Sequence, residues 1–323
     1  MFGRIVVIIM TVKIEQYIRE KAFGLGFGAV GFARVAPSQS SVIFQQWLAK
    51  EYGAEMYYLK RHAALRSDPR NLLPSARTVI VVGARYPARN PPPAPPGRGS
   101  DDLECKISNY ARGLDYHVVL NEKLAQLAFA LEEKHGQPIK SRICVDSAPL
   151  PEREWAVRAG IGWIGKQGSV VSPEIGCCFF LGELLVDIDL EPGAPMANQC
   201  QDCRRCVEAC PAKAIMAGNL VDARRCVSYL TVEHKGEINP DIASCFGGSV
   251  FGCDRCTSVC PWNQRAEKPV MPEFDIPPSA VPSLEVLGRL DRHGFKKMFA
   301  NTPVERTGFE RFQRNVKIAL ANQ

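Results

Sequence analysis

The pattern of cysteines in the second half of this 323-residue chain restricts its possible folds more than any other feature. One set is followed by a proline and reads C-x-x-C-x-x-C-x-x-x-C-P: Cys200, Cys203, Cys206 and Cys210. A second set ends in C-x-x-C-x-x-x-C-P: Cys226, Cys253, Cys256 and Cys260. The first spacing is the iron–sulfur signature of bacterial ferredoxins. Because a cubane cluster takes four thiolates, eight such ligands predict two [4Fe–4S] clusters.

In two-cluster ferredoxins, the fourth cysteine of each run binds the other cluster. This rule predicts that four cysteines hold the first cluster: Cys200, Cys203, Cys206 and Cys260. It predicts that four others hold the second: Cys210, Cys226, Cys253 and Cys256. Two neighbouring clusters indicate that the protein delivers electrons to a further site.

Other uses of these cysteines fit the pattern less well. Disulfides need an oxidising compartment, and nothing near the N-terminus resembles an export signal. Zinc sites usually contain separated C-x-x-C pairs rather than a triplet with a Cys-Pro end. Free cysteine is among the most buried residue types, so a core role is expected for the remaining five: Cys105, Cys144, Cys177, Cys178 and Cys245.

Composition indicates a globular protein of about two domains. With 46% hydrophobic residues, 23% charged residues and a formal charge of +6, the chain permits an anionic partner without requiring one. The apolar stretch at 5–10 is too short for a signal-peptide core or a membrane span. We therefore expect a cytoplasmic monomer with no membrane partner. Residues 1–12 are expected to be an extra leader, with Met10 as an alternative start.

The first part of the chain, residues 13–192, mixes helical and strand patterns and predicts an α/β or α+β domain. Helices are predicted at 14–25, 44–52, 57–65, 120–134 and from 152 to 159. Strands are predicted at 29–35, 78–84, 139–145, 169–172 and 177–189. The run 78–84 is continuously apolar, which predicts a central strand covered on both faces. Residues 87–99 are predicted to form a proline-rich surface loop.

A ferredoxin-like domain is predicted at 193–265, and a C-terminal linker with a helix pair at 266–323. Within the ferredoxin-like domain, Asp222 is predicted to cap a helix that contains Cys226, after a short strand at 219–221. The C-terminal helices are predicted at two positions: 283–299 and 304–321. The second is strongly cationic, which is typical of a solvated face and less often of a nucleic-acid contact.

Two further segments have patterns found at functional sites. The segment 160–165 (GIGWIG) matches a dinucleotide spelling, but it follows a helix and precedes a strand, so a dinucleotide fold is excluded. The segment 145–153 (VDSAPLPER) places Asp146 at a strand end, where catalytic residues often lie. A carboxyl shielded from water can keep its proton and act as a general acid. Residue patterns alone leave a structural cap as an equal alternative.

Several blocks resemble the epoxyqueuosine reductase family, and the resemblance covers almost the whole chain from about residue 13. The blocks are KISNYARGLDYH (106–117), VDSAPLPER (145–153), AGIGWIGKQGS (159–169), FLGELLVDIDL (180–190), VDARRCVSYLTVE (221–233) and FGCDRCTSVCPWN (251–263). The resemblance implies a cobalamin-binding catalytic domain at 13–192 beside the ferredoxin-like domain. It implies reduction of epoxyqueuosine to queuosine in the anticodon stem-loop of tRNA. The catalytic core is also similar to that of reductive dehalogenases.

The same resemblance implies roles for individual residues. Asp146 would donate a proton to the epoxide oxygen, and Cys226 would be a cluster ligand. Lys235 would contact the tRNA or the cofactor tail. Cobalamin contacts would come from several segments: Arg66, Asp146, Val170, Ser228 and the loop Cys253, Asp254, Arg255 and Cys256. No histidine stands in the setting of a cobalt ligand, so neither His117 nor His234 is expected to bind cobalt.

Two alternatives remain. One is a corrinoid and iron–sulfur reductase that acts on a small molecule, similar to reductive dehalogenases. The other is an electron carrier without a substrate, against which the large N-terminal domain argues. In each case an external low-potential electron donor is expected. The chain also departs from many relatives, which carry a longer C-terminal helical extension.

Overall fold

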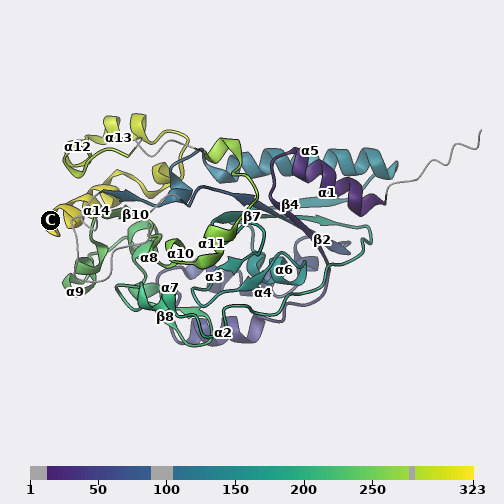
Figure 1. Cartoon of the computed structure of the whole chain (residues 1–323), viewed down its shortest axis with the longest axis horizontal. Coiled ribbons are helices and arrows are strands. Elements are labelled where there is room, and N and C mark those ends of the chain that lie inside the picture. The colour runs from purple at the N-terminus through teal and green to yellow at the C-terminus, as the bar shows by residue number, and fades with distance from the viewer. Residues whose placement is uncertain (1–12, 89–104, 276–280) are drawn as a thin grey trace, which may run out of the picture.

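The computed structural model describes residues 13–88, 105–275 and 281–323 (Figure 1). The predicted leader at 1–12 and most of the predicted proline-rich loop at 87–99 lie outside these residues. The molecule is elongated, with the largest sheet at one end and the cysteine-rich and C-terminal helices at the other. Within the described ranges, no helix combines the length and apolar character needed to cross a bilayer.

A four-stranded sheet forms the centre of the N-terminal part. Its order is β1 (Ala29–Arg34), β2 (Thr78–Arg85), β7 (Phe179–Val186) and β4 (Ser141–Cys144). All three neighbouring pairs are antiparallel. The residues of β2 from Thr78 to Ala84 are all buried, which confirms the predicted central strand. Together with the helices on both faces, this sheet confirms the predicted mixed α/β class.

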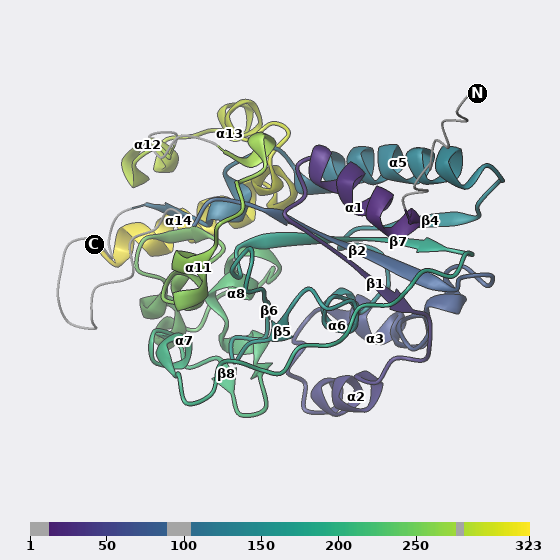
Figure 2. The same cartoon turned by 45° about the vertical axis from the view of Figure 1, so that its right-hand side comes forward.

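The sheet is covered by helices on both faces (Figure 2). Helices α1 (Ile14–Gly24) and α5 (Tyr116–His135) lie on one face, and α6 (Glu152–Arg158) lies on the other. Helix α5 begins four residues earlier than predicted, because the Asp115 side chain accepts a hydrogen bond from the His117 amide and caps it. The helix predicted at 57–65 is divided at His62 into two short helices, α3 (Tyr57–Arg61) and α4 (Ala63–Arg66). Helix α2 (Ser41–Ala49) precedes them.

The GIGWIG segment is a tight packing element. Gly162 precedes a small hairpin formed by β5 (Trp163–Ile164) and β6 (Val170–Val171). A Cβ atom on Gly162 would lie 2.0 Å from the Val171 carbonyl oxygen, so only glycine fits there. The glycine spacing therefore serves close approach of two backbone segments, in agreement with the exclusion of a dinucleotide fold.

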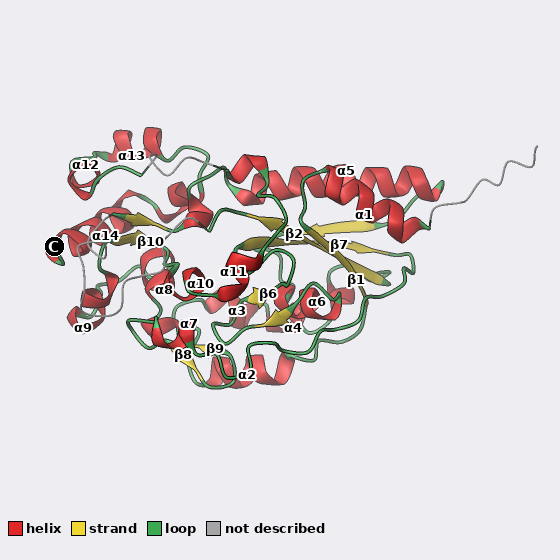
Figure 3. Ribbon diagram, in the orientation of Figure 1, coloured by secondary structure: helices red, strands yellow, loops and turns green. Residues whose placement is uncertain are grey.

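The cysteine-rich region consists of short elements (Figure 3). These are α7 (Arg205–Glu208), β8 (Ile215–Met216), β9 (Leu220–Val221), α8 (Val227–Val232), α9 (Pro240–Ala243), β10 (Ser249–Phe251), α10 (Arg255–Ser258) and α11 (Pro261–Arg265). Asp222 does act as a cap, but of a 3-10 turn at Ala223–Arg225. The predicted helix through Cys226 is wrong, because Cys226 has an extended backbone that separates this turn from α8. Strand β10 pairs in parallel with β3 (Lys106–Ile107), which joins this region to the N-terminal part.

In the described part of the C-terminal segment, three α-helices replace the predicted pair: α12 (Leu284–Gly288), α13 (Arg292–Met298) and α14 (Phe309–Ala321). The helix predicted at 283–299 is interrupted because Asp291 caps α13 by accepting a hydrogen bond from the Gly294 amide at 2.7 Å. Helix α14 packs Phe312 and Val316 against β10. The buried Asn315 side chain also donates to the carbonyl oxygens of Thr231 and Val250, so α14 is anchored to the cysteine-rich region.

Candidate functional site

Asp146 lies directly beyond β4 in a left-handed backbone conformation, with φ of +48°. Its carboxylate accepts hydrogen bonds from the Tyr116 hydroxyl at 2.9 Å and from His117 Nε2 at 3.1 Å. Its backbone N–H donates to Glu152 Oε1 at 2.5 Å. Left-handed backbone is disfavoured for residues other than glycine, although aspartate enters it more readily than most, and these contacts stabilise Asp146 in it.

The charges around Asp146 favour its ionised form. Burial alone would raise its pKa, but the hydrogen bonds from His117 and Tyr116 and the charges of His117 and Arg306 lower it below its ordinary value. The Asp146 side chain is 56% exposed, so the shielded carboxyl expected from the sequence is not what the structure shows. A general acid here must be supplied with a proton by a neighbouring group.

His117 is the neighbour best placed to carry that proton. Burial and the charge of Arg306 lower its pKa, but the hydrogen bonds that the imidazole donates to Asp146 and Asp115 outweigh them, and the net pKa is raised. His117 Nδ1 lies 2.6 Å from Asp115 Oδ1, and Arg306 Nη1 lies 3.7 Å from Asp115 Oδ2. Two carboxylates therefore flank the imidazole and stabilise its positive charge.

A second group of ionisable side chains lies behind Asp146. Glu152 begins helix α6, and its pKa is raised to about 7 by burial and by the charge of Asp146. Glu183 projects from β7 and is completely buried. The Arg66 side chain donates to the Leu150 carbonyl oxygen at 3.1 Å. Burial lowers the pKa of Arg66, and the nearby charges of Glu152 and Asp146 oppose this by raising it. The structure therefore brings the predicted residues Arg66 and Asp146 together.

The thiols of the first predicted cluster set lie near one another. Burial is the main cause that raises the pKa of the Cys206 thiol. The charges of three further cysteines also raise it, in the order Cys200, Cys260 and Cys203. The indole N–H of Trp163 donates to Cys200 Sγ at 3.4 Å. An N–H directed at a thiolate stabilises its charge, so this contact suits a metal-bound sulfur.

The second predicted set is gathered in the same way. Burial is the main cause that raises the pKa of the Cys256 thiol. The charges of three other thiols of the set also raise it, in the order Cys253, Cys226 and Cys210. Cys206 acts on Cys256 more weakly, so the two groups are neighbours. Burial raises the pKa of both Cys226 and Glu152, and the charge of Arg153 opposes this rise at each of them, so Arg153 lies near both groups.

The remaining predicted cofactor contacts differ in what their side chains do. Val170 is buried in β6, and Ser228 lies half-buried in α8. The Asp254 carboxylate accepts from the Ser108 hydroxyl and the Asn109 amide. Arg255 is buried and donates to the carbonyl oxygens of Cys245 and Phe246. The side chains of Asp254 and Arg255 thus hold the loop in place.

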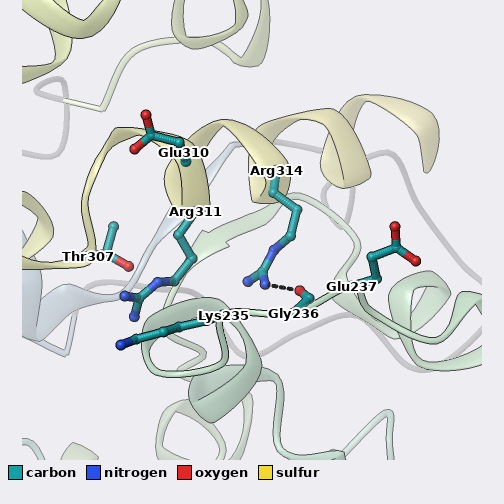
Figure 4. Close-up of a pocket in the computed structure, with 7 residues that line it drawn as sticks. All are labelled: Lys235, Gly236, Glu237, Thr307, Glu310, Arg311 and Arg314. Atoms are coloured by element: carbon teal, nitrogen blue, oxygen red, sulfur yellow. Dashed lines mark hydrogen bonds between the residues drawn. The ribbon is translucent and has the colours of Figure 1, made fainter.

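Lys235 lines a surface cavity of about 480 Å³ between the end of α8 and α14 (Figure 4). Two arginines from α14 enter the same cavity. Arg314 donates to the carbonyl oxygens of Leu230, His234 and Gly236, and Arg311 donates to those of Val232 and Glu233. Much of the cationic face of α14 is therefore used to bind the carbonyl groups that end α8.

Several residues of the site were not predicted from the sequence to be functional: Tyr116, Glu152, Glu183 and Arg306. His117 was named there only as a histidine that is not expected to bind cobalt. Tyr116 and His117 had a local signal, since they follow the capping residue Asp115 in the block LDYH. His234, the other histidine considered, interacts with Glu55 Oε2 at 3.1 Å and with the Glu237 carbonyl oxygen at 2.9 Å.

Comparisons with known proteins agree with this arrangement. A family model described as epoxyqueuosine reductase QueG matches residues 66–147, which include Arg66 and Asp146. A model described as a 4Fe-4S double cluster binding domain matches residues 199–263, which include all eight cysteines of the two sets. The epoxyqueuosine reductase of Alicycliphilus denitrificans is 39% identical over 315 residues, covering 96% of this chain and 86% of the relative. The epoxyqueuosine reductase of Escherichia coli is 37% identical over 314 residues, covering 96% of this chain and 81% of the relative.

Solved structures give the same result. The epoxyqueuosine reductase of Streptococcus thermophilus matches with a TM-score of 0.84 at 31% identity, over 96% of this chain and 82% of that one. A crystal structure of an epoxyqueuosine reductase with an epoxyqueuosine-modified tRNA-Tyr stem loop matches with a TM-score of 0.84 at 29% identity, over 96% and 81%. The chain therefore belongs to the epoxyqueuosine reductase family and is an oxidoreductase with a domain for two 4Fe-4S clusters.

Proposed function

We propose that this protein reduces epoxyqueuosine to queuosine in the anticodon stem-loop of tRNA, with cobalamin as the reactive cofactor and Asp146 as the proton donor. The observation that carries the proposal is the position of Asp146. It lies near Arg66, and its amide contacts Glu152, in a chain that aligns with epoxyqueuosine reductases over 96% of its length.

The two thiol groups are the proposed cluster ligands, in the crossed sets expected from ferredoxins. The first cluster takes Cys200, Cys203, Cys206 and Cys260, and the second takes Cys210, Cys226, Cys253 and Cys256. Their adjacency supports transfer of single electrons from an external low-potential donor, through one cluster and then the other. Arg153, which follows the Asp146 contact Glu152 in the chain, acts on the pKa of Cys226 in the second set.

Polar groups near Asp146 suit a large cofactor with amide side chains. Among the described residues, the buried Arg66 Nε has no hydrogen-bond partner, and an acceptor on a bound molecule would satisfy it. Arg66, Asp146, Val170, Ser228 and the backbone of the Cys253–Cys256 loop are the proposed cobalamin contacts. Bound cobalamin would supply electrons to the carbon–oxygen bond of the epoxide.

The protein's own contribution is to deliver protons. Conversion of an epoxide to an alkene and water consumes two electrons and two protons, and the departing oxygen requires an acid. Asp146 is the proposed donor, and protonated His117, 3.1 Å away, returns a proton to it. Tyr116 and Arg306 orient this pair and favour the ionised carboxylate between turnovers.

The tRNA is the proposed macromolecular partner, since a related enzyme was solved with a modified tRNA stem loop. Lys235 at the mouth of the cavity beside α14 is the proposed phosphate contact. The alternative of a small-molecule reductase has little support, because reductive dehalogenase structures match with a TM-score of only 0.47 at 15% identity.

The test is anaerobic reconstitution with iron, sulfide and cobalamin, followed by assay on tRNA that contains epoxyqueuosine. Mass spectrometry of the nucleosides should show loss of one oxygen that depends on cobalamin. Asp146→Asn should abolish this change while iron content and cobalamin binding stay intact. Asp189→Asn is the matched control, because Asp189 is also 56% exposed and ion-paired, but lies beside Arg77 in the segment that follows β7.

Two outcomes would contradict the proposal. Eight irons and bound cobalamin without any change in the tRNA would favour a small-molecule substrate. Full activity of Asp146→Asn would remove Asp146 from the role of proton donor and leave it as a structural residue.

A further inference from the structure

Glu183 is a buried carboxyl that the proposed proton transfer does not use. It lies on β7 between the neighbouring strands β2 and β4, in register with Val81 and Cys144. Its side chain is 0% exposed, and among the described residues neither of its oxygens has a hydrogen-bond donor. An ionised carboxylate without a donor is strongly disfavoured away from water, so Glu183 must hold a proton or share one.

Glu152 is the group with which Glu183 can share a proton. Helix α6, which Glu152 begins, packs against β7. Burial is the main cause that raises the pKa of Glu183, and the neighbouring Glu152 carboxyl is the next, ahead of the charge of Asp146. Two carboxyl groups form a hydrogen bond only when one of them is protonated. Two adjacent carboxylates repel each other, so the pair retains one proton at a pH where isolated carboxyls are ionised.

Glu152 also has a direct contact with Asp146. Glu152 Oε1 accepts the Asp146 backbone N–H at 2.5 Å. The charges that face Glu152 are Asp146, Arg153 and Arg66, while Glu183 faces Glu152, Asp146 and the Cys144 thiol. One shared proton therefore leaves a single negative charge on the pair, close to the amide that holds Asp146 in its left-handed conformation.

We propose that Glu152 and Glu183 share one proton and, in this singly charged state, position Asp146. Glu183 supplies the proton that keeps the two carboxyls together, and Glu152 anchors the Asp146 amide. Loss of the shared proton places two carboxylates in contact in an apolar layer. They separate, and the Asp146 amide loses its acceptor. The pair is thus a positioning unit that acts through Asp146. The expected effect on activity rests on the proposed function, whereas the shared proton and the position of the Asp146 amide do not.

The first test needs no substrate. Infrared spectra of the reconstituted protein, with and without ¹³C-labelled glutamate, should show the carbonyl stretch of a protonated glutamic acid near pH 6. Glu183→Gln should remove this band, because the amide replaces the protonated carboxyl and leaves Glu152 ionised. Glu154→Gln is the matched control: Glu154 lies on the same helix and is buried, but its partners are Ser38 and Ser40, so the band should persist.

Hydrogen exchange then tests the positioning role. The protection factor of the Asp146 amide, corrected for the intrinsic rate, should fall at least about tenfold between about pH 6 and pH 9 in the unchanged protein. In Glu183→Gln it should stay constant, because the amide N–H remains a donor to Glu152 at every pH. In single-turnover assays near pH 6, the control Glu154→Gln should retain the rate within about twofold, whereas Glu152→Ala should lower it at least about tenfold.

The outcomes separate the two proposals. Absence of the protonated band, or its persistence in Glu183→Gln, would overturn the shared proton. A protection factor that does not depend on pH would overturn the positioning role. Band and protection that behave as expected, in a protein that leaves the modified tRNA unchanged, would confirm the pair and refute the proposed reaction.

Discussion

Titration of the Glu152–Glu183 pair should make the free energy of unfolding fall as pH rises. The pKa of Glu152 is about 7 in the folded protein, against an ordinary value of 4.5, because of burial and the charge of Asp146. A group whose folded-state pKa is raised stabilises the fold fully below its unfolded pKa. That stabilisation is lost as pH rises through the folded pKa. The expected window therefore runs from pH 4.5 to about 7.

The size of the effect follows from the width of this window. At about 1.4 kcal/mol for each pH unit, the loss across the window is on the order of 3 kcal/mol. Glu152 is half-buried rather than fully buried, and solvent screening reduces this to ~2 kcal/mol. His117 contributes with the same sign because its pKa is raised, and Asp146 with the opposite sign because its pKa is lowered. A comparison of variants is therefore needed to isolate the pair.

Glu183→Gln isolates it, because a permanent amide donor stabilises ionised Glu152 and removes the shared proton. Urea unfolding of the reconstituted protein, followed anaerobically by tryptophan fluorescence, should be measured from about pH 5 to about pH 8. Stability of the unchanged protein relative to Glu183→Gln should fall by ~2 kcal/mol across this range. Stability of the unchanged protein relative to Glu154→Gln should stay constant across this range. Hydrogen bonds from Ser38 and Ser40 outweigh burial and lower the pKa of Glu154, so Glu154 is ionised throughout. Parallel curves for Glu183→Gln and the unchanged protein would refute the shared proton.

Further predictions concern the site and the packing around it. Tyr116→Phe should raise the pKa of Asp146, because a hydrogen bond to its carboxylate is lost; a shift in the pH dependence of single-turnover reduction would show this. Asp291→Ala should lower the free energy of unfolding by about 1 kcal/mol through loss of the α13 cap, measured by urea unfolding. Phe312→Ala should cost about 3–5 kcal/mol in the same assay, because Phe312 is fully buried between α14 and β10. Gly162→Ala should yield little folded protein on expression, since its Cβ would overlap the Val171 carbonyl oxygen.

Local sequence predicted the parts of the molecule that depend on spacing and on short-range chemistry. The apolar run at 78–84 became the fully buried strand β2 because no face of it can be exposed without cost. The helix predicted at 283–299 was wrong, because its apolar spacing continues across Asp291 while the side chain of that residue starts a new helix. Here a single local hydrogen bond outweighed the periodic pattern.

The cysteine spacing determined the cluster domain by itself, because thiolate ligation depends on residue type and on separations of a few residues. The position of Asp146 at a strand end was equally readable, since it follows an apolar run directly. Its protonation state was not. Asp146 meets Tyr116 and His117 from 29–30 residues away, and Arg306, which acts on its pKa, lies in the C-terminal segment. Glu152 and Glu183 meet only because helix α6 packs on strand β7. The charges and proton positions of the site therefore depend on tertiary packing, because electrostatic interactions depend on distance in space and on burial, which a linear sequence does not contain.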